Sequence, residues 1–387
     1  MQLHDNLKMI IPVIDGKNPA VVKKNRGKTF YLEETLMKKL STKIVLAVAM
    51  VVSALGLISC KEEDDKTLYL YNWTYYTPED VVANFEKDFG VKVKIDNYAS
   101  NEEMYSKLRA GAKGYDIVFP SQDYASIMIS QGMVRELDLS KIPNSKYVNP
   151  KMLKKTVYDP EMKYAVPYYY GAAGISVNKT KVDWDYDRSW NIFADTRFHG
   201  HATMMDDMRE VLGDALVMNG NSVNSLDDTE LKNAADIVIN NWKPNLVKFD
   251  AEGFGKNFAS GDFWLCQGYA EVTYGEVPEE KWEDTIDFFI PEEGGPAYLD
   301  SMMILKDAKH YDLANEFINY IYKPENYAMF LDFFCFPDYI VPEARQYMHT
   351  TPHYEASAMD KCVLKMDIGA DLDKYNSRWQ EIRFSAD

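Results

Sequence analysis

The stretch from residue 68 to residue 76 reads Leu-Tyr-Leu-Tyr-Asn-Trp-Thr-Tyr-Tyr and runs directly into a proline at position 78. Its first half is apolar and aromatic, as is typical of a short buried strand. Its second half gathers ring and hydroxyl side chains just before the turn. In an α/β sheet, ligands bind beyond the carboxyl ends of the strands. We therefore predict that Trp73, Thr74 and Tyr76 line a binding cleft, although a core role for such aromatic side chains is equally common.

The chain continues from this strand as an alternation of helices and strands. Apolar residues at helical spacing predict a helix over 78–89 that ends at Gly90, and an alternating pattern predicts a strand over 91–95. A second helix is expected to begin at Ser100, and a third strand is expected over 115–119. This order predicts right-handed crossovers and a mostly parallel sheet.

The same alternation returns more loosely in the second half of the chain. Strands are expected over 165–170, 174–178 and 202–205, and helices over 209–218 and 229–240. We therefore predict an α/β fold with two lobes, each a central sheet with flanking helices. No Gly-Ser linker separates the two halves, so the lobes are expected to be joined by hinge strands.

The residues before the first strand have the pattern of an export signal. Two lysines at 38 and 39 precede an apolar run over 44–58, which is too short to span a bilayer, since a spanning helix needs ~20 apolar residues. The run ends in Leu-Ile-Ser-Cys60, which resembles the bacterial lipoprotein box and implies a lipid on Cys60. We interpret 1–36 as a spurious extension, 37–59 as the signal peptide and 60–66 as a charged tether.

Composition narrows the possible partners. The formal net charge is −17, which disfavours nucleic acid and favours cations. Roughly 320 residues follow Cys60, which suggests two domains. The cysteines Cys266, Cys335 and Cys362 form no Cys-x-x-Cys pair, so we expect no metal site. They allow one disulfide at most, or three free thiols.

Several motifs resemble the spermidine/putrescine-binding proteins of ABC uptake systems. They are Tyr71-Asn72-Trp73-Thr74, Tyr115-Asp116-Ile117-Val118-x-Pro120-Ser121, Asp206-Asp207-x-Arg209-Glu210 and Gly295-x-x-Tyr298-Leu299-Asp300-Ser301. The resemblance covers about 67–382 with its motifs in the family's order. It implies the periplasmic-binding-protein fold, with one lobe of 67–172 plus 300–342 and a second of 173–299 plus 343–387, closing over a polyamine by hinge bending.

The resemblance also implies a place and partners for the protein. We expect a monomeric, lipid-anchored receptor in the periplasm or displayed on the outer surface, which delivers a polyamine to ABC permease subunits. No enzymatic activity and no cofactor are implied. Two alternatives stay open: the same fold binding another cationic or neutral solute, and a hydrolase that uses paired carboxylates. The sequence contains no nucleophile motif that would support the hydrolase.

A polyamine is a methylene chain that carries ammonium groups, and therefore needs aromatic faces and carboxylates. The resemblance implies five aromatic walls: Trp73, Tyr76, Tyr269, Tyr298 and Phe336.

Polar roles follow from the same resemblance. Thr74 and Ser121 are expected to accept hydrogen bonds from a terminal ammonium. Asp207 and Glu210 are expected to neutralise one amine, and Asp300 the next. Spacing alone favours a plainer interpretation of Asp207 and Glu210, as the N-cap and first-turn acid of a helix.

Some positions depart from the family pattern and leave the particular polyamine open. Asp123 stands where an aromatic residue is usual, and is a further candidate for binding an amine. Glu271 follows Tyr269 closely and is another candidate carboxylate. Lys365 falls where a neutral amide is typical. A lysine that faces a cationic ligand is costly, so we expect it to pair with Asp123 or to point outward.

Overall fold

The computed structural model describes residues 66–74 and 76–385, which belong to the unit Asp65–Asp387. The predicted extension 1–36, the predicted signal peptide 37–59 and the predicted lipidation site Cys60 lie outside the described residues. Among the residues that are described, no helix has both the length and the apolar character needed to cross a membrane.

The described residues build a first sheet of six strands in the order β11-β10-β3-β1-β2, with β4 also paired to β10. The strands are β1 (Thr67–Trp73), β2 (Lys92–Tyr98), β3 (Ile117–Val118), β4 (Ala165–Ala172), β10 (Pro296–Ile304) and β11 (Val363–Leu364). β1 is parallel to β2 and β3, whereas β10 is antiparallel to β3 and β4. We call this sheet and its helices the first lobe.

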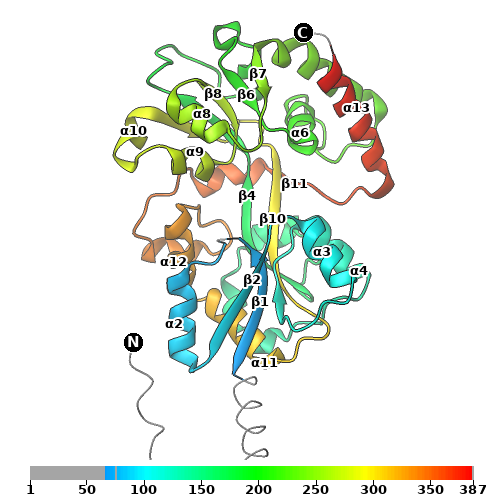
Figure 1. Ribbon diagram of the computed structural model, residues 1–387, viewed down its shortest axis with the longest axis vertical. Helices are drawn as coiled ribbons and strands as arrows, with labels where there is room; N and C mark the ends of the chain where they lie inside the picture. The colour runs from blue at the N-terminus through cyan, green and yellow to red at the C-terminus, as the bar shows by residue number, and fades with distance from the viewer. Residues whose placement is uncertain (1–65, 75, 386–387) are drawn as a thin grey trace, which may run out of the picture. The chain divides into compact units, whose positions relative to one another are not determined.

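Helices flank the first sheet, as Figure 1 shows for α2, α3, α4, α11 and α12. They are α2 (Glu79–Phe89), α3 (Asn101–Arg109), α4 (Gln122–Ser130), α5 (Pro150–Lys155), α11 (Tyr311–Ile321) and α12 (Pro324–Phe334). α2 buries Phe85 against the ring of Phe317, with centroids 5.0 Å apart. Gly90 ends this helix with φ of 64°, in the left-handed region where a glycine is favoured.

A second sheet of five strands lies in the second lobe, in the order β7-β6-β8-β5-β9. Its strands are β5 (Gly174–Asn178), β6 (Ala202–Met204), β7 (Leu246–Phe249), β8 (Leu265–Gly268) and β9 (Ile286–Phe289). Its helices are α6 (Met208–Met218), α7 (Asp228–Ile237), α8 (Phe254–Ser260), α9 (Ala270–Glu276), α10 (Trp282–Thr285) and α13 (Leu372–Phe384). α6, α7 and α13 pack together over a core that includes the fully buried Trp190 and Trp242.

The predicted elements are confirmed in kind and in order, and the predicted strand 174–178 is β5 itself. The expected parallel pairing is only partly right. Both sheets are mixed, because β10 enters the first sheet antiparallel to β3 and β4, while β5 lies antiparallel to β8 and β9. The two-lobed α/β architecture agrees with the prediction.

Three crossings connect the lobes. The chain leaves the first sheet after β4 and enters the second with β5, so the expected boundary at 172/173 falls between two strands. It returns through β10, which continues without a break across the expected boundary at 299/300. It crosses again after β11, which pairs with β10 before α13 packs in the second lobe. Figure 1 shows β4 and β10 side by side where the first sheet approaches the second lobe.

The three cysteines within the described residues are free thiols. Cys266 and Cys362 are buried, and Cys335 is partly exposed. Of the two arrangements that the sequence left open, the structure has the one without a disulfide.

Candidate functional site

A cavity of about 830 Å³ lies between the two lobes, within the usual size range for small-molecule sites. Its first-lobe wall comes from the end of β1 and the starts of α3 and α4. Its second-lobe wall comes from the starts of α6 and α9 and from α13, while β10 and the residues after β11 complete it. The predicted residues that line it are Trp73, Tyr76, Ser121, Asp123, Asp207, Tyr269, Tyr298 and Asp300.

Trp73 forms a fixed aromatic wall at the carboxyl end of β1. Its indole Nε1 donates a hydrogen bond to the carbonyl oxygen of Phe119 at 2.8 Å. Its ring packs against that of Tyr98, with centroids 4.8 Å apart. The hydroxyl of Tyr98 donates to the same Phe119 carbonyl at 2.6 Å. Two rings from neighbouring strands are thus tied to one acceptor, which holds the half-buried face of Trp73 toward the cavity.

Asp300 is the most deeply buried carboxylate of the cavity wall, with 4% of the residue exposed. Its two oxygens accept hydrogen bonds of 2.7 Å, one from the Tyr76 hydroxyl and one from the Ser121 hydroxyl. A β-bulge in the β10–β4 pairing falls between Asp300 and Ser301, and bulges of this kind re-aim a side chain. Burial raises the pKa of Asp300 to about 6. No cation faces it within hydrogen-bond distance among the described residues, so Asp300 keeps its charge available for a ligand.

Two tyrosine rings form a corner where the lobes meet. The rings of Tyr269 and Tyr298 lie edge to face, with centroids 5.5 Å apart. Gly171 on β4 makes room for Tyr298, since a Cβ there would lie 2.6 Å from the Tyr298 Cζ atom. Tyr169 supports Tyr298 from the side at 5.9 Å between centroids.

Asp207 has the helix-capping role that its spacing alone favours. It is the N-cap of α6, where its Oδ1 accepts from the backbone N–H groups of Arg209 and Glu210 at 2.8 and 3.1 Å. It also lines the cavity. The neighbouring Asp206 lines the cavity as well and pairs with Arg383 of α13 at 2.8 Å.

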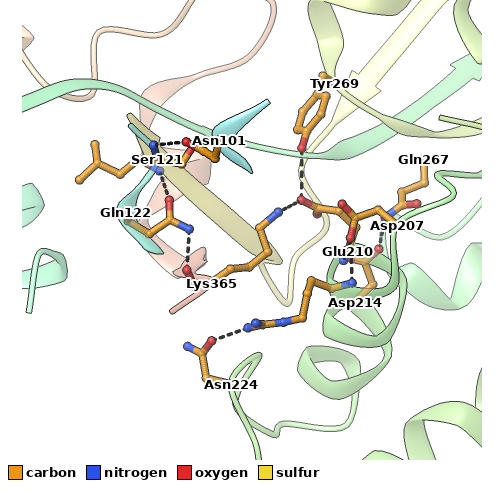
Figure 2. Close-up of polar contacts among 12 residues, drawn as sticks. Asn101, Ser121, Gln122, Asp207, Glu210, Asp214, Asn224, Gln267, Tyr269 and Lys365 are labelled. Atoms are coloured by element: carbon orange, nitrogen blue, oxygen red, sulfur yellow. Dashed lines mark hydrogen bonds and ion pairs between the residues drawn. The ribbon is translucent and has the colours of Figure 1, made fainter. Parts of the chain in front are cut away.

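Glu210 lies behind the cavity wall. The residue is fully buried, and its Oε1 accepts hydrogen bonds from the ammonium of Lys365 and, at 3.3 Å, from the hydroxyl of Tyr269. Figure 2 shows both donors converging on this oxygen. The expectation that Lys365 would pair with Asp123 or point outward is therefore wrong, because its partner is Glu210. Lys365 itself lines the cavity.

Two further carboxyl groups line the cavity and have raised pKa values. Burial raises the pKa of Glu271 to about 7. Burial also raises the pKa of Asp123, whose buried Oδ1 has no hydrogen-bond partner among the described residues. Each group gains by meeting a cationic ligand, since an opposite charge favours the ionised form.

Besides Glu210, two predicted residues lie elsewhere than on the wall. Thr74 is exposed, and its hydroxyl donates to the carbonyl oxygen of Tyr98 at 3.5 Å. Phe336 is buried and stacks on Tyr169 with centroids 3.7 Å apart, so it supports the wall from behind.

Sequence reasoning did not anticipate several lining residues, among them Asn101, Gln122, Trp379 and Arg383. Trp379 and Arg383 are four residues apart on α13 and hence share one helix face. That spacing was the available signal, but nothing in the sequence links this helix to the cavity. Among residues 66–74 and 76–385, no group of His, Cys, Asp or Glu side chains is arranged to hold a metal ion.

Comparisons with known proteins agree with the two-lobed α/β fold. Residues 80–337 match the family model for bacterial extracellular solute-binding proteins. The chain is 31% identical over 360 residues to the spermidine/putrescine-binding periplasmic protein of Escherichia coli K12, covering 90% of this chain and 99% of that protein. It is also 31% identical to the putrescine-binding periplasmic protein PotF of the same strain, covering 77% of this chain and 83% of that protein.

A solved structure is also similar to this chain. The crystal structure of the TpPotD lipoprotein of Treponema pallidum superposes with a TM-score of 0.78 at 48% identity, covering 82% of this chain and 100% of that chain.

Proposed function

Because the chain belongs to the family of bacterial extracellular solute-binding proteins, we propose that it captures a polyamine such as putrescine or spermidine in the cavity between its lobes. It then presents the closed complex to the permease subunits of an ABC transporter. Both of these relatives carry polyamine-binding names, and their family consists of receptors, not of enzymes. No catalytic step is assigned to the cavity.

One observation carries the proposal. Asp300 is an almost fully buried carboxylate held by two neutral hydroxyl groups, in the wall of a cavity that is also lined by Trp73, Tyr76 and Tyr298. An ammonium group has three donors and no acceptor, so it complements a carboxylate that has no cation of its own. The rings offer flat faces to the methylene groups and attract the cation, by ~2 kcal/mol when water is excluded.

Burial explains why such a site would favour a charged ligand. Removing the Asp300 carboxylate from water is unfavourable in the free protein, as its raised pKa reflects. A bound ammonium restores the lost electrostatic stabilisation, whereas a neutral ligand does not. The acidic balance of the chain, with a net charge of −17, also raises the local concentration of cations.

The proposed location follows from the leader sequence and the relatives. The protein would be exported, anchored through a lipid on Cys60, and would act as a monomer outside the cytoplasmic membrane. Mass spectrometry of the mature N-terminus tests the anchor. A lipid-modified peptide that begins at Cys60 supports it, and an unmodified mature terminus contradicts it.

Calorimetry tests the ligand. The protein expressed from its complete coding sequence is titrated with putrescine, spermidine and spermine, with the dicarboxylate glutarate as a control of similar length and opposite charge. Heat of binding with at least one amine and none with glutarate supports the proposal. Absence of heat with all three amines at micromolar protein rejects it.

A further inference from the structure

Ser121 does not cap the helix that it precedes. It stands at the N-cap of α4 with extended backbone, yet its side chain accepts no hydrogen bond from that helix. A serine at this position ordinarily accepts from the backbone N–H group two or three residues further on. Ser100 does so at the start of α3, where its hydroxyl oxygen accepts from the N–H of Glu103 at 3.1 Å. The Ser121 hydroxyl is therefore committed to partners outside its own helix.

Backbone pairing places Ser121 opposite Asp300. The two residues form an isolated antiparallel bridge, and the N–H of Ser301 donates to the carbonyl oxygen of Pro120 at 3.0 Å. The Ser121 hydroxyl then donates to Oδ1 of Asp300 at 2.7 Å. Because the bridge fixes the two backbones, the side-chain torsion of Ser121 decides whether its hydroxyl reaches the carboxylate.

Asn101, the first residue of α3, holds this torsion. Its Oδ1 accepts from the backbone N–H of Ser121 at 3.2 Å, and its Nδ2 donates to the Ser121 hydroxyl oxygen at 3.0 Å. Figure 2 shows the Asn101 side chain beside Ser121. A backbone N–H can only donate, so the amide oxygen must face it and the amide nitrogen must face the hydroxyl. With this N–H on its oxygen, the Ser121 hydroxyl directs its own hydrogen at Asp300.

The hydrogen bond from Ser121 opposes the effect of burial on Asp300. Burial raises the pKa of Asp300 to about 6, and the hydroxyls of Ser121 and Tyr76 lower it. Two charged groups also act on this carboxyl: Asp123 of α4 raises its pKa, and Lys365 lowers it. The other tyrosines that interact with it electrostatically are Tyr98, Tyr158, Tyr168 and Tyr298. Substitutions of neutral residues leave all of these groups in place.

Resting on the function proposed above, we propose that Asn101 is a positioning residue for the ligand amine, which holds the Ser121 hydroxyl against Asp300 and so keeps this carboxylate charged and oriented for a cation. All three residues line the cavity, but Asn101 acts through the other two. Two plainer roles predict different results. A purely structural tie between α3 and α4 affects stability alone, and a direct contact with the ligand affects only the bound protein.

Titration of the Asp300 carboxyl in the amine-free protein separates these roles. The full chain is labelled with carbon-13 at its aspartate carboxyl groups, freed of amines by dialysis, and followed by NMR as the pH is raised. The Asp300 signal is identified by its loss in Asp300→Asn.

Five forms of the protein are compared, each checked for folding by thermal melting. They are the wild type, Asn101→Ala, Ser121→Ala, the double variant Asn101→Ala/Ser121→Ala, and Asn84→Ala as a control. Asn84 lies on α2, is exposed and is outside the cavity wall, so its substitution removes the same amide group without touching the cavity. Asn101→Ser serves as a second variant if Asn101→Ala does not fold, because the serine side chain is too short to bridge to the Ser121 hydroxyl.

We expect Ser121→Ala to raise the midpoint of the Asp300 titration by about one pH unit, because a donor to the charged form is lost. Asn101→Ala should raise it by about half a pH unit or more, because the hydroxyl is then free to turn away. In the double variant the loss of Asn101 should add nothing to the effect of Ser121→Ala, since the group through which it acts is gone. Asn84→Ala should leave the midpoint where it is in the wild type.

Two results of the titration would overturn the inference. One is a midpoint in Asn101→Ala within about 0.2 pH unit of the wild type, which leaves Asn101 a structural tie or a direct ligand contact. The other is a midpoint in the double variant that exceeds that of Ser121→Ala by as much as Asn101→Ala exceeds the wild type, which means that Asn101 acts without Ser121.

Calorimetry with putrescine connects the titration to binding. At about pH 6 the affinity of Asn101→Ala should be at least about twofold below that of the control, since a smaller fraction of Asp300 is ionised, and at about pH 8 the difference should shrink. A loss that is equal at both pH values contradicts the inference and indicates a direct contact with the ligand. A wild type that binds no amine rejects the proposed function, whereas the NMR titration, made without ligand, still decides how Asn101 acts on Asp300.

Discussion

Replacing Asp300 by asparagine should weaken ligand binding and stabilise the ligand-free protein at the same time. The substitution keeps the shape of the side chain, and the hydroxyls of Tyr76 and Ser121 can still form hydrogen bonds with the amide. It removes only the charge. Loss of a hydrogen bond to a charged partner costs about 2–3 kcal/mol, which corresponds to a roughly 100-fold weaker affinity for the amine.

The stability change follows from the pKa of Asp300, which is raised from 3.8 to about 6 by burial. The folded state binds this proton more tightly than the unfolded state. The free energy of unfolding therefore falls as the pH rises through this interval, and the full cost of the buried charge is present above about pH 6. Two pKa units correspond to about 3 kcal/mol. Asp300→Asn should recover up to that amount at pH 7.5 and little at pH 4.

Thermal melting of the amine-free protein at pH 7.5 measures the gain, which should raise Tm by roughly 5 °C, and calorimetry measures the affinity. Asp307→Asn is the matched control. It removes the same charge from an exposed side chain that pairs with Lys113 at 3.4 Å, and exposed pairs contribute little. A lower Tm for Asp300→Asn at pH 7.5, or an amine affinity within about twofold of wild type, would refute the reasoning.

Three further predictions concern the same cavity and its surroundings. The amine affinity should fall by about tenfold between pH 7.5 and pH 5, measured by calorimetry, because Asp300 with a pKa of about 6 must be ionised to pair; a flat profile contradicts its role. Gly171→Ala places a Cβ 2.6 Å from Tyr298 and 2.8 Å from Tyr169, and should weaken binding by roughly tenfold by moving the ring; unchanged affinity would place Tyr298 outside the ligand contact. A thiol reagent should modify Cys335 in the native protein and the other two described cysteines only after unfolding; a buried thiol reacting first would be inconsistent with this packing.

Local patterns predicted the elements well because their causes are local. Ser100 followed by two glutamates indicated a helix start. The structure confirms it, with the Ser100 hydroxyl accepting from the Glu103 N–H at 3.1 Å and the Glu103 carboxylate accepting from the Ala99 N–H at 2.9 Å. The strand 174–178 was bounded by a glycine and by polar residues, and is found unchanged.

The direction of strand pairing could not be predicted in the same way. Alternation of side chains is the same in parallel and antiparallel strands, so the pattern over β10 says nothing about its partners. Met303 of β10 lies opposite Val118 of β3, far back along the chain. The antiparallel insertion of β10 is decided by this long-range packing. The prediction of a mostly parallel sheet was drawn from the first three strands alone. It therefore could not take the antiparallel pairing of β10 into account.

The candidate site shows a related division. Aromatic, hydroxyl and acidic positions were predicted from the resemblance, and eight of them line the same cavity. Their partners were not found, because Lys365 and Glu210 are 155 residues apart. Residue type identifies a carboxylate, but only the packing of α6 against the residues after β11 decides whether it faces a ligand or a lysine.

The difference between carboxylates that are free for a ligand and carboxylates that are paired within the protein affects how amine specificity is inferred from a sequence. Counting acidic residues in the motifs overestimates the number of ligand amines that the cavity can bind. A carboxylate that already forms an ion pair within the protein does not offer its charge to a ligand. Asp300 is held by neutral hydroxyls and keeps its charge for a ligand, whereas Glu210 is matched by Lys365 and Asp206 by Arg383. If the pairing sets the count, a relative that carries a neutral residue in place of Lys365 but keeps Glu210 should accept one more amine than this protein. Calorimetry with a triamine and a diamine on such a pair of proteins would show it, and equal preferences in both would mean that cavity shape, not internal charge pairing, selects the ligand.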